Sequence, residues 1–316
     1  MFNFLARRFF SSIISVIGAT LAIFVLIQFH NDPRELFVPD SGYGISQEQW
    51  EALGDRLGLN DPLWKQYVDW VGRTLRGDLG VSLARDRAVT ELLRGKIGAT
   101  VQLAIGSWVF AIALGIPMGV LAAVKRGSGW DYFGRGLAIV GQAAPPFVTA
   151  LVAIWIFAVW LEWLPAGGRS PEFNWKEYLL PCMALGWGAA ASLMRLTRSS
   201  MLEVLDSEYI RLARAKGVNW NWVIYKHALR NALIVPVTSA LLTFSGWLNG
   251  ALVVEIVFSW PGIGYEALYR AVNDNDFPLL LGTVFIFILI YLVFATIADV
   301  AYTIIDPRVR LGDSSE

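Results

Sequence analysis

The chain has 316 residues, of which 55% are hydrophobic and 16% are charged, whereas about 25% of residues are charged in an average soluble protein. This composition excludes an ordinary water-soluble globular protein. Lysine plus arginine and aspartate plus glutamate both number 26, so no overall basic charge indicates a nucleic-acid partner. A single cysteine, Cys182, excludes a disulfide framework and a multi-thiolate metal site, and two histidines leave little for metal or general-base chemistry.

Six stretches meet or approach the roughly 20 apolar residues that a membrane-spanning helix requires. They are residues 9–29, 98–124, 136–160, 178–194, 232–256 and 280–304. The first stretch is longer than the apolar region of a typical signal peptide and no small-residue cleavage site follows it, so we expect a retained anchor. The sequence predicts an all-α membrane protein with six transmembrane helices.

The first polar segment, residues 30–97, carries helix signals that predict a folded insertion. Ser46 and Gln49 form a capping box, and Gly58 is expected to end the helix that follows. The dipeptide Asp61-Pro62 is expected to begin a second helix as N-cap and first helical residue. Its apolar residues recur at helical spacing: Trp64, Val68, Val71 and Leu75. Two interpretations stay open, a small lid packed on the helix bundle and a docking surface or pore cover.

The third apolar stretch contains two adjacent prolines. Pro145 and Pro146 follow Gln142, and prolines inside a membrane helix free backbone carbonyls that neighbours or a water-filled path must satisfy. Either a plain kink or a pore lining explains this pattern. Close helix packing is expected at Gly115-x-x-x-Gly119 and at Gly246-x-x-x-Gly250.

The second long polar segment, residues 195–231, has the pattern helix, glycine, helix. Asp206 or Ser207 is expected to cap the first helix, Gly217 to end it in a left-handed conformation, and Asn219 to cap the second. Small residues and tryptophans in this segment suit a groove in a partner protein. The alternative is a basic loop that only fixes the membrane topology.

The charge distribution predicts the orientation of the spans. With six spans both termini share one side, and the segments on that side carry fourteen basic and seven acidic residues. Short loops rich in lysine and arginine stay in the cytoplasm. The termini and residues 195–231 are therefore expected inside, and residues 30–97 outside.

Reactive centres that would make this chain an enzyme are missing from the sequence. No lysine is followed by serine or threonine, so the phosphate-binding motif G-x-x-x-x-G-K-[ST] does not occur. The motifs G-x-S-x-G and H-E-x-x-H are also absent. Glu255 and Asp299 are the charged residues within the six stretches, and such acids are functional candidates by default. A proton relay and a structural or pore-lining role both stay open for them.

Two segments resemble the cytoplasmic EAA loop of bacterial ABC importer permeases, with the best match in the dipeptide/oligopeptide/nickel branch. They are EYIRLARAKG at 208–217 and HALRNALIVP at 227–236. Further similar segments are GDLGVSL at 77–83, IGATVQLAI at 97–105, VFSWPGIG at 257–264 and DPRVRL at 306–311. The chain departs from the family at Arg211, where the generic loop has glutamate, and at His30-Asn31-Asp32-Pro33, where a Pro-Gly-Asp-Pro sequence is usual.

This resemblance implies one transmembrane permease domain over residues 1–316 in the bacterial inner membrane. The subunit would pair with a second, homologous permease, sit on two ATPase subunits and receive substrate from an extracytoplasmic binding protein. ATP and magnesium would bind to the ATPase subunits, so no cofactor, metal or catalytic residue is expected in this chain. The implied cargo is short peptides, or a related solute such as a nickel chelate or glutathione.

The resemblance also implies roles for individual residues. Residues 30–97 would form an extracytoplasmic scoop and residues 195–231 a cytoplasmic coupling loop. The residues implied in contact with the ATPase are Glu208, Arg211, Ala213, Ala215, Lys216 and Gly217. Candidates for the translocation path are Gln142, Pro145, Pro146 and Asn249. A rival hypothesis is a proton-coupled secondary transporter that uses Glu255 and Asp299.

Overall fold

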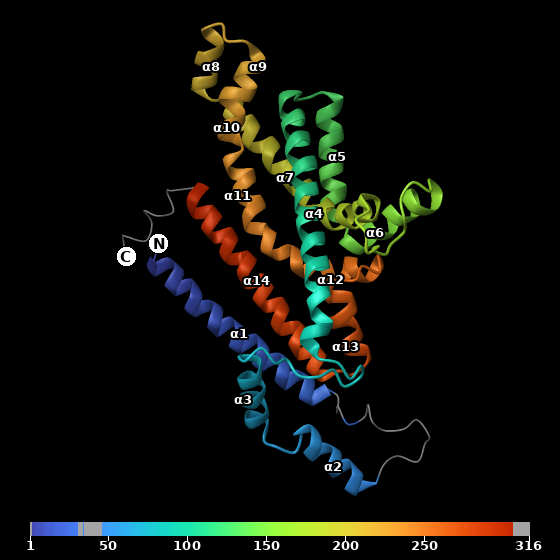
Figure 1. Ribbon diagram of the computed structural model, residues 1–316. Coiled ribbons are helices and arrows are strands. Elements are labelled where there is room, and N and C mark those ends of the chain that lie inside the picture. The colour runs from blue at the N-terminus through green and yellow to red at the C-terminus, as the bar shows by residue number, and fades with distance from the viewer. Residues whose placement is uncertain (1, 31–33, 35–45, 306–316) are drawn as a thin grey trace. The chain divides into compact units, whose positions relative to one another are not determined.

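The computed structural model describes residues 2–30, 34 and 46–305, and this part of the chain is almost entirely helical (Figure 1). It contains no β-strand, only one isolated bridge between Val81 and Ala88. Contacts divide the chain into two compact units. Unit 1 holds residues 1–100 and 261–292, and unit 2 holds residues 101–260 and 293–316. That the whole chain forms one permease domain stays a prediction.

Three helices in the described residues are long and apolar enough to cross a membrane. They are α4 (Val89–Val124), α7 (Trp175–Leu205) and the Phe277–Ala298 part of α14 (Phe277–Ile305). The apolar part of α1 (Phe2–His30) is shorter, at Phe10–Leu26. Both α4 and α7 extend past the apolar stretches that predicted them, because charged turns continue each helix beyond its apolar part. The count of six spans stays a prediction.

The third apolar stretch is a broken helix rather than one straight rod. Helix α5 (Gly129–Ala143) ends before Pro145, and the chain then bends by 114° into α6 (Pro146–Ala153) and a π-helical segment, Ile154–Trp160. Proline disfavours helical geometry in the residue before it and removes one backbone donor, which explains the position of the break. If this bent pair is one span, the described chain has up to four candidate spans.

The fifth apolar stretch is also interrupted. Helix α11 (Ile234–Thr243) passes through a 3-10 turn, Phe244–Gly246, into α12 (Trp247–Val257). A Ser-Gly pair lies at this turn, and such pairs are common sites of helix distortion. This stretch therefore differs from the continuous helix that its composition predicts.

In unit 1, the predicted helix signals of residues 46–58 are confirmed. Helix α2 (Gln47–Leu57) begins with a capping box: the Gln49 N–H donates to Ser46 Oγ over 3.2 Å, and the Ser46 N–H donates to Gln49 Oε1 over 3.0 Å. Gly58 ends the helix with φ +70°. The prediction for the next helix is one residue early, since Pro62 is the N-cap of α3 (Leu63–Thr74) and Asp61 instead pairs with Lys65 at 2.8 Å.

Helix α3 packs on α1 mainly through an aromatic face, and of its predicted apolar stripe only Val71 packs against the same cluster. Tyr67 stacks edge-on against Phe24 of α1 with ring centres 5.4 Å apart, and its hydroxyl lies 3.0 Å from Thr20 Oγ1. Trp70 is buried against Phe285 of α14. The other three side chains of the stripe are exposed, at 70% for Trp64, 58% for Val68 and 82% for Leu75.

A buried carboxylate fixes the loop between α3 and α4 to the start of α14. Asp276 is fully buried and accepts hydrogen bonds from the Ser82 hydroxyl, from the Leu83 N–H at 3.2 Å and from the Leu279 N–H at 3.2 Å. The last of these bonds caps α14 at its N-terminus, where helix amides lack partners. Two short helical segments precede α14, Gly264–Tyr269 and α13 (Arg270–Asn273). They contribute the buried Ala267 and Ala271 to an apolar core that also contains Leu279 of α14.

In unit 2, helix α7 is the central element, and glycines bring α4 against its backbone and α5 against its side chains. A Cβ on Gly115 of α4 would lie 2.6 Å from the Ala190 carbonyl oxygen, and one on Gly119 would lie 2.6 Å from that of Met194. On the α5 side, a Cβ on Gly141 would lie 2.6 Å from the Ala191 Cβ. These distances are shorter than real Cβ contacts, so the prediction for Gly115-x-x-x-Gly119 is confirmed. Gly246, in contrast, faces open space.

The segment between the π-helical turn and α7 is held by a polar and aromatic cluster in unit 2. Arg169 donates to Gln102 Oε1 over 2.9 Å and to the Tyr178 hydroxyl over 3.0 Å. The Tyr178 ring packs edge-on against the buried Trp260, with ring centres 4.8 Å apart. The Gly168 N–H donates to the Phe258 carbonyl over 2.7 Å. Phe258 and Trp260 of the motif VFSWPGIG thus anchor this connection.

Candidate functional site

Residues 206–232 form a helical elbow that projects beyond the end of α7 (Figure 1). Helix α8 (Glu208–Ala215) ends at Gly217, whose φ is +76°. The Gly217 N–H donates to the Arg214 carbonyl over 2.9 Å, and the Val218 N–H donates to the Ala213 carbonyl over 3.2 Å. These two bonds form a Schellman motif, so the prediction of a left-handed stop at Gly217 is confirmed.

The second arm of the elbow begins as the sequence predicts. The Asn219 side chain accepts a hydrogen bond from the Asn221 N–H over 2.9 Å at the start of α9 (Trp220–Trp222). A π-helical segment, Val223–Ala228, and α10 (Leu229–Ala232) then continue toward α11. Ser207 is the N-cap residue of α8, but its hydroxyl donates to the Val204 carbonyl over 2.5 Å and makes no cap bond. The predicted loop also begins later, because α7 remains helical to Leu205.

A compact apolar cluster holds the elbow on the ends of α4 and α7. Ile210 of α8 is 1% exposed and lies in the same cluster as Met201 of α7 and Ala123 of α4. The second arm contributes Val223, Ile224, Ala228 and Ala232. One face of the elbow is therefore fixed to the helices of unit 2.

The opposite face of α8 is exposed and contains most of the predicted coupling residues. Glu208, Arg211, Ala215, Lys216 and Gly217 are exposed. Glu208 and Arg211 pair with each other at 2.8 Å, and Leu212, which lies next to them, is 57% exposed. Ala213 differs from the others, because it is half-buried and packs against the chain's own apolar cluster.

The break between α5 and α6 borders a cavity of about 530 Å³. Gln142, Pro145 and Pro146 line it, as do Gly188 and Ser192 of α7. Three of the four predicted path residues therefore meet at one cavity in unit 2. The side chain of the fourth, Asn249, lies outside the described residues, although Gly246 lines the cavity one turn earlier in the chain.

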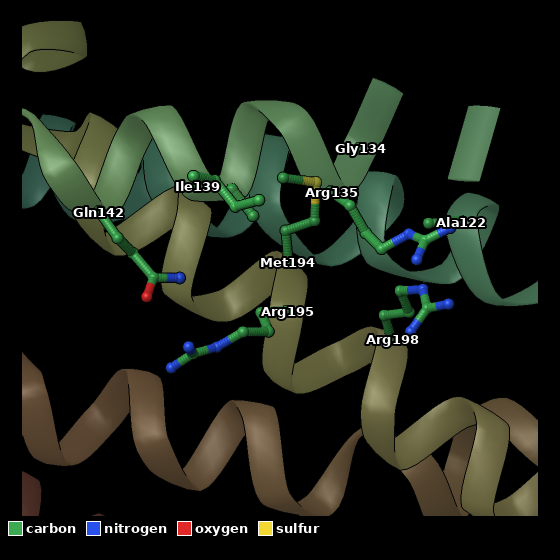
Figure 2. A pocket seen from close by; sticks show the side chains of 9 residues that line it. Ala122, Gly134, Arg135, Ile139, Gln142, Met194, Arg195 and Arg198 are labelled. Carbon is green, nitrogen blue, oxygen red and sulfur yellow. The ribbon is translucent and has the colours of Figure 1, made fainter. Parts of the chain in front are cut away.

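A second cavity of about 310 Å³ lies between α4, α5 and α7 and was not predicted from the sequence (Figure 2). Asp131 is buried and pairs with Arg198 through two hydrogen bonds of 2.7 and 3.1 Å, and with Arg135 at 3.3 Å. Both of these arginines line the cavity, as does Arg195. The Asp131–Arg135 pair has the local i,i+4 spacing of a helical ion pair, but no local pattern could have indicated the pair with Arg198, which is 67 residues away in the chain.

The acids of the rival hypothesis are only partly described. Glu255 of α12 is fully buried in unit 2. The side chains of Asp299 and of His30 lie outside the described residues, as do the rest of the segment His30-Asn31-Asp32-Pro33 and the segment DPRVRL. Whether the two acids lie together as a proton relay therefore falls outside the described residues.

Two family models match the chain. Residues 115–311 match the binding-protein-dependent transport system inner membrane component, and residues 1–104 match the N-terminal family of such membrane components. Together they cover the elbow, both cavities and the predicted scoop.

Individual relatives and a solved structure agree with this assignment. The chain is 37% identical over 98% of its length to the whole dipeptide transport system permease protein DppB of Alkalihalophilus pseudofirmus. It is 34% identical over 98% of its length, and 99% of the relative, to the glutathione transport system permease protein GsiC of Escherichia coli. In fold it resembles a chain of the MetNI methionine ABC transporter in an inward-facing conformation, with a TM-score of 0.57 and 17% identity over 69% of this chain and 97% of that chain.

These similarities support an importer permease and give no support to the proton-coupled alternative. They agree with the resemblance that the EAA-type segments indicated. The chain belongs to the family of binding-protein-dependent transport system inner membrane components, the membrane-embedded permease subunits of ABC importers.

Proposed function

We propose that this permease imports short peptides, or a related small solute such as glutathione or a nickel chelate, across the cytoplasmic membrane. The observation that carries the cargo class is the full-length similarity to a dipeptide permease and a glutathione permease. In this proposal the chain pairs with a second permease subunit, and an extracytoplasmic binding protein delivers the substrate. Two ATPase subunits bind ATP and magnesium, and this chain holds neither.

The elbow is the proposed contact with an ATPase subunit. Its apolar face is fixed by Ile210, whereas Glu208, Arg211, Ala215, Lys216 and Gly217 are exposed and available to a partner. Small residues at Ala215 and Gly217 allow close approach of a groove, and the charged residues around them supply polar contacts. The half-buried Ala213 supports this surface from within, which refines the role that the family resemblance implies for it.

The cavity at the Pro145 break is the proposed part of the translocation path that this chain contributes. Broken helices in membrane proteins occur where they border protein or a water-filled cavity, and this break borders a cavity of about 530 Å³. Transport then follows alternating access: ATP-driven closure of the ATPase pair moves the elbows, and the spans open the path outward.

Uptake by the assembled transporter tests this function directly. The chain, its partner permease, the ATPases and the binding protein are reconstituted in vesicles, and uptake of a radiolabelled dipeptide and of glutathione is measured with and without ATP. ATP-dependent accumulation of either solute is expected. Uptake that continues without ATP and stops with a proton uncoupler would contradict the proposal.

A matched pair of alanine substitutions tests the coupling surface. Ala215→Asp adds a charge to the exposed face of the elbow, and an unpaired charge buried in a dry groove costs several kcal/mol. We expect this variant to reach the membrane, to lose co-purifying ATPase and to lose uptake. Ala52→Asp, on an exposed alanine of α2, is the control and should retain the ATPase. Normal ATPase retention by Ala215→Asp would remove the elbow from the interface.

The proposed topology has six spans with both termini in the cytoplasm. Cys182 is buried, so it gives little background in cysteine labelling. Glu48 on α2 and Glu203 on α7 are both exposed, so only the side of the membrane should decide whether a cysteine there is labelled. A membrane-impermeant maleimide added from outside should therefore label Glu48→Cys, which lies outside in this topology, and spare Glu203→Cys, which lies inside. The reverse pattern would overturn the orientation.

A further inference from the structure

The cavity between α4, α5 and α7 has two chemically different ends. Figure 2 shows Arg135 and Arg198 facing each other at one end, and Gln142 and Arg195 extending together at the other. Ile139 and Met194 lie between them and form an apolar wall. A ligand in this cavity would meet a charged or polar group at each end of an apolar middle.

The three arginines differ in how their charge is balanced. Asp131 is shared by Arg198 and Arg135, and its buried carboxylate fixes both guanidinium groups in place. Arg195 is exposed and has no ion pair or hydrogen bond with any side chain in the described residues. Within the part of the chain that the structure describes, its guanidinium donors are therefore available to a ligand, in a cavity with excess positive charge.

Arg195 also lies beside the proposed translocation path. Gln142 lines both cavities, so the two are adjacent at this residue. Ser192, which lines the path cavity, precedes Arg195 by three residues on α7, and residues three apart share one face of a helix. A solute that leaves the path cavity past Gln142 meets Arg195 next.

We propose that Arg195, assisted by the Gln142 amide, binds the terminal carboxylate of the transported peptide at the inner end of the path. This inference rests on the proposed function and adds the group that the permease itself recognises. A guanidinium matches a carboxylate with two parallel hydrogen bonds, which makes arginine the preferred partner for this group. The neighbouring apolar wall accepts the side chain of the adjacent residue.

A membrane lipid offers a competing occupant for the same charge. Basic pockets between membrane helices on the cytoplasmic side also bind anionic headgroups. A lipid bound in the cavity would shield it from a chemical label to an extent that depends on membrane composition and not on added peptide. The experiment therefore varies the lipid composition and the peptide.

The test measures protection of a cysteine beside Arg195 in the assembled, nucleotide-free transporter in nanodiscs. Ser192→Cys reports on the path cavity, and mass spectrometry of this chain gives its rate of alkylation with Arg195 intact, with Arg195→Gln and with Arg195→Lys. Trialanine and trialanine amide are the probes, in nanodiscs of phosphatidylcholine alone and with added phosphatidylglycerol. With Arg195 intact, trialanine is expected to slow alkylation and its amide is not.

Arg195→Gln should raise the trialanine concentration that halves the alkylation rate at least about tenfold, as expected for loss of a charge-assisted hydrogen bond. The concentration needed with Arg195→Lys should lie between those of Arg195→Gln and of the unmodified residue. Arg126→Gln, which removes an exposed arginine from outside both cavities, is the control and should keep the difference between the two peptides. Equal protection by acid and amide, no protection by either, or protection by phosphatidylglycerol alone would each overturn the inference. ATP-driven peptide uptake by the unmodified transporter, measured alongside, would show that the proposed function stands even then.

Discussion

The two helical pairs outside the main helices, α2–α3 in unit 1 and α8–α9 in unit 2, share the same local construction. Each turns at a glycine with positive φ, +70° at Gly58 and +76° at Gly217. In each turn the glycine N–H donates three residues back, and the next N–H donates five residues back. Neither glycine has an atom within 4 Å of an added Cβ, so conformation alone selects glycine at both positions.

The pairs differ in what each buries. The elbow buries Ile210 almost completely in an apolar cluster and exposes a mixed polar face. Helix α3 buries Trp70 but leaves Trp64, Val68 and Leu75 exposed. Local sequence therefore determines where a helical pair turns, whereas the contacts between elements determine which apolar residues are buried.

The largest expected difference between the pairs is the cost of removing an apolar side chain. Ile210→Ala should destabilise the elbow by about 2–5 kcal/mol, because it leaves a cavity in a packed cluster. Val68→Ala, on the exposed face of α3, should cost less than about 0.5 kcal/mol. Thermal unfolding of the purified transporter, followed by tryptophan fluorescence, measures both. Similar losses for the two variants would mean that α3 is covered by a partner in the assembled protein.

The two glycines provide a comparison with equal strain. Gly217→Val and Gly58→Val should each cost about 1–2 kcal/mol, since a β-branched residue is forced into the left-handed region. Only Gly217→Val is expected to abolish ATP-dependent uptake at normal membrane abundance, because it misdirects the arm that joins the elbow to α11. Equal uptake by both variants would contradict a coupling role for the elbow.

The smallest expected difference concerns the two serine N-caps. Ser46→Ala removes a complete capping box and should cost about 1 kcal/mol, whereas Ser207→Ala removes no cap bond and should cost less. Hydrogen–deuterium exchange in the first turn of α2 and α8 measures each effect locally. If Ser207→Ala accelerated exchange in α8 more than Ser46→Ala accelerated it in α2, Ser207 would cap its helix in solution.

The sequence predicted best those features that depend on neighbouring residues. The capping box at Ser46, the stop at Gly217 and the cap at Asn219 were all predicted correctly, because each is formed within five residues of the chain. The position of the break at Pro145 was also predictable, but its angle of 114° was not, because packing against α7 and α12 decides where the chain continues.

Contacts between distant residues limited the rest of the prediction. The bond between Asp131 of α5 and Arg198 of α7 joins two helices that no sequence pattern relates. The buried Asp276 gave a usable signal that we missed: an aspartate placed just before Phe277-Pro278 is typical of a helix N-cap. Its bonds to Ser82 and Leu83 could not be predicted, because they join residues more than 190 positions apart.

The glycine contacts along α7 have a mechanical consequence. The glycines of α4 lie against the α7 backbone and Gly141 of α5 lies against the Ala191 side chain, so we expect the packed parts of these helices to move together. The last residue of α7 leads into the elbow, and Ser192 and Gly188 at the cavity lie about 20–25 Å back along the same helix. Because α7 is one continuous helix between these positions, we expect a displacement of the elbow to move the cavity wall directly.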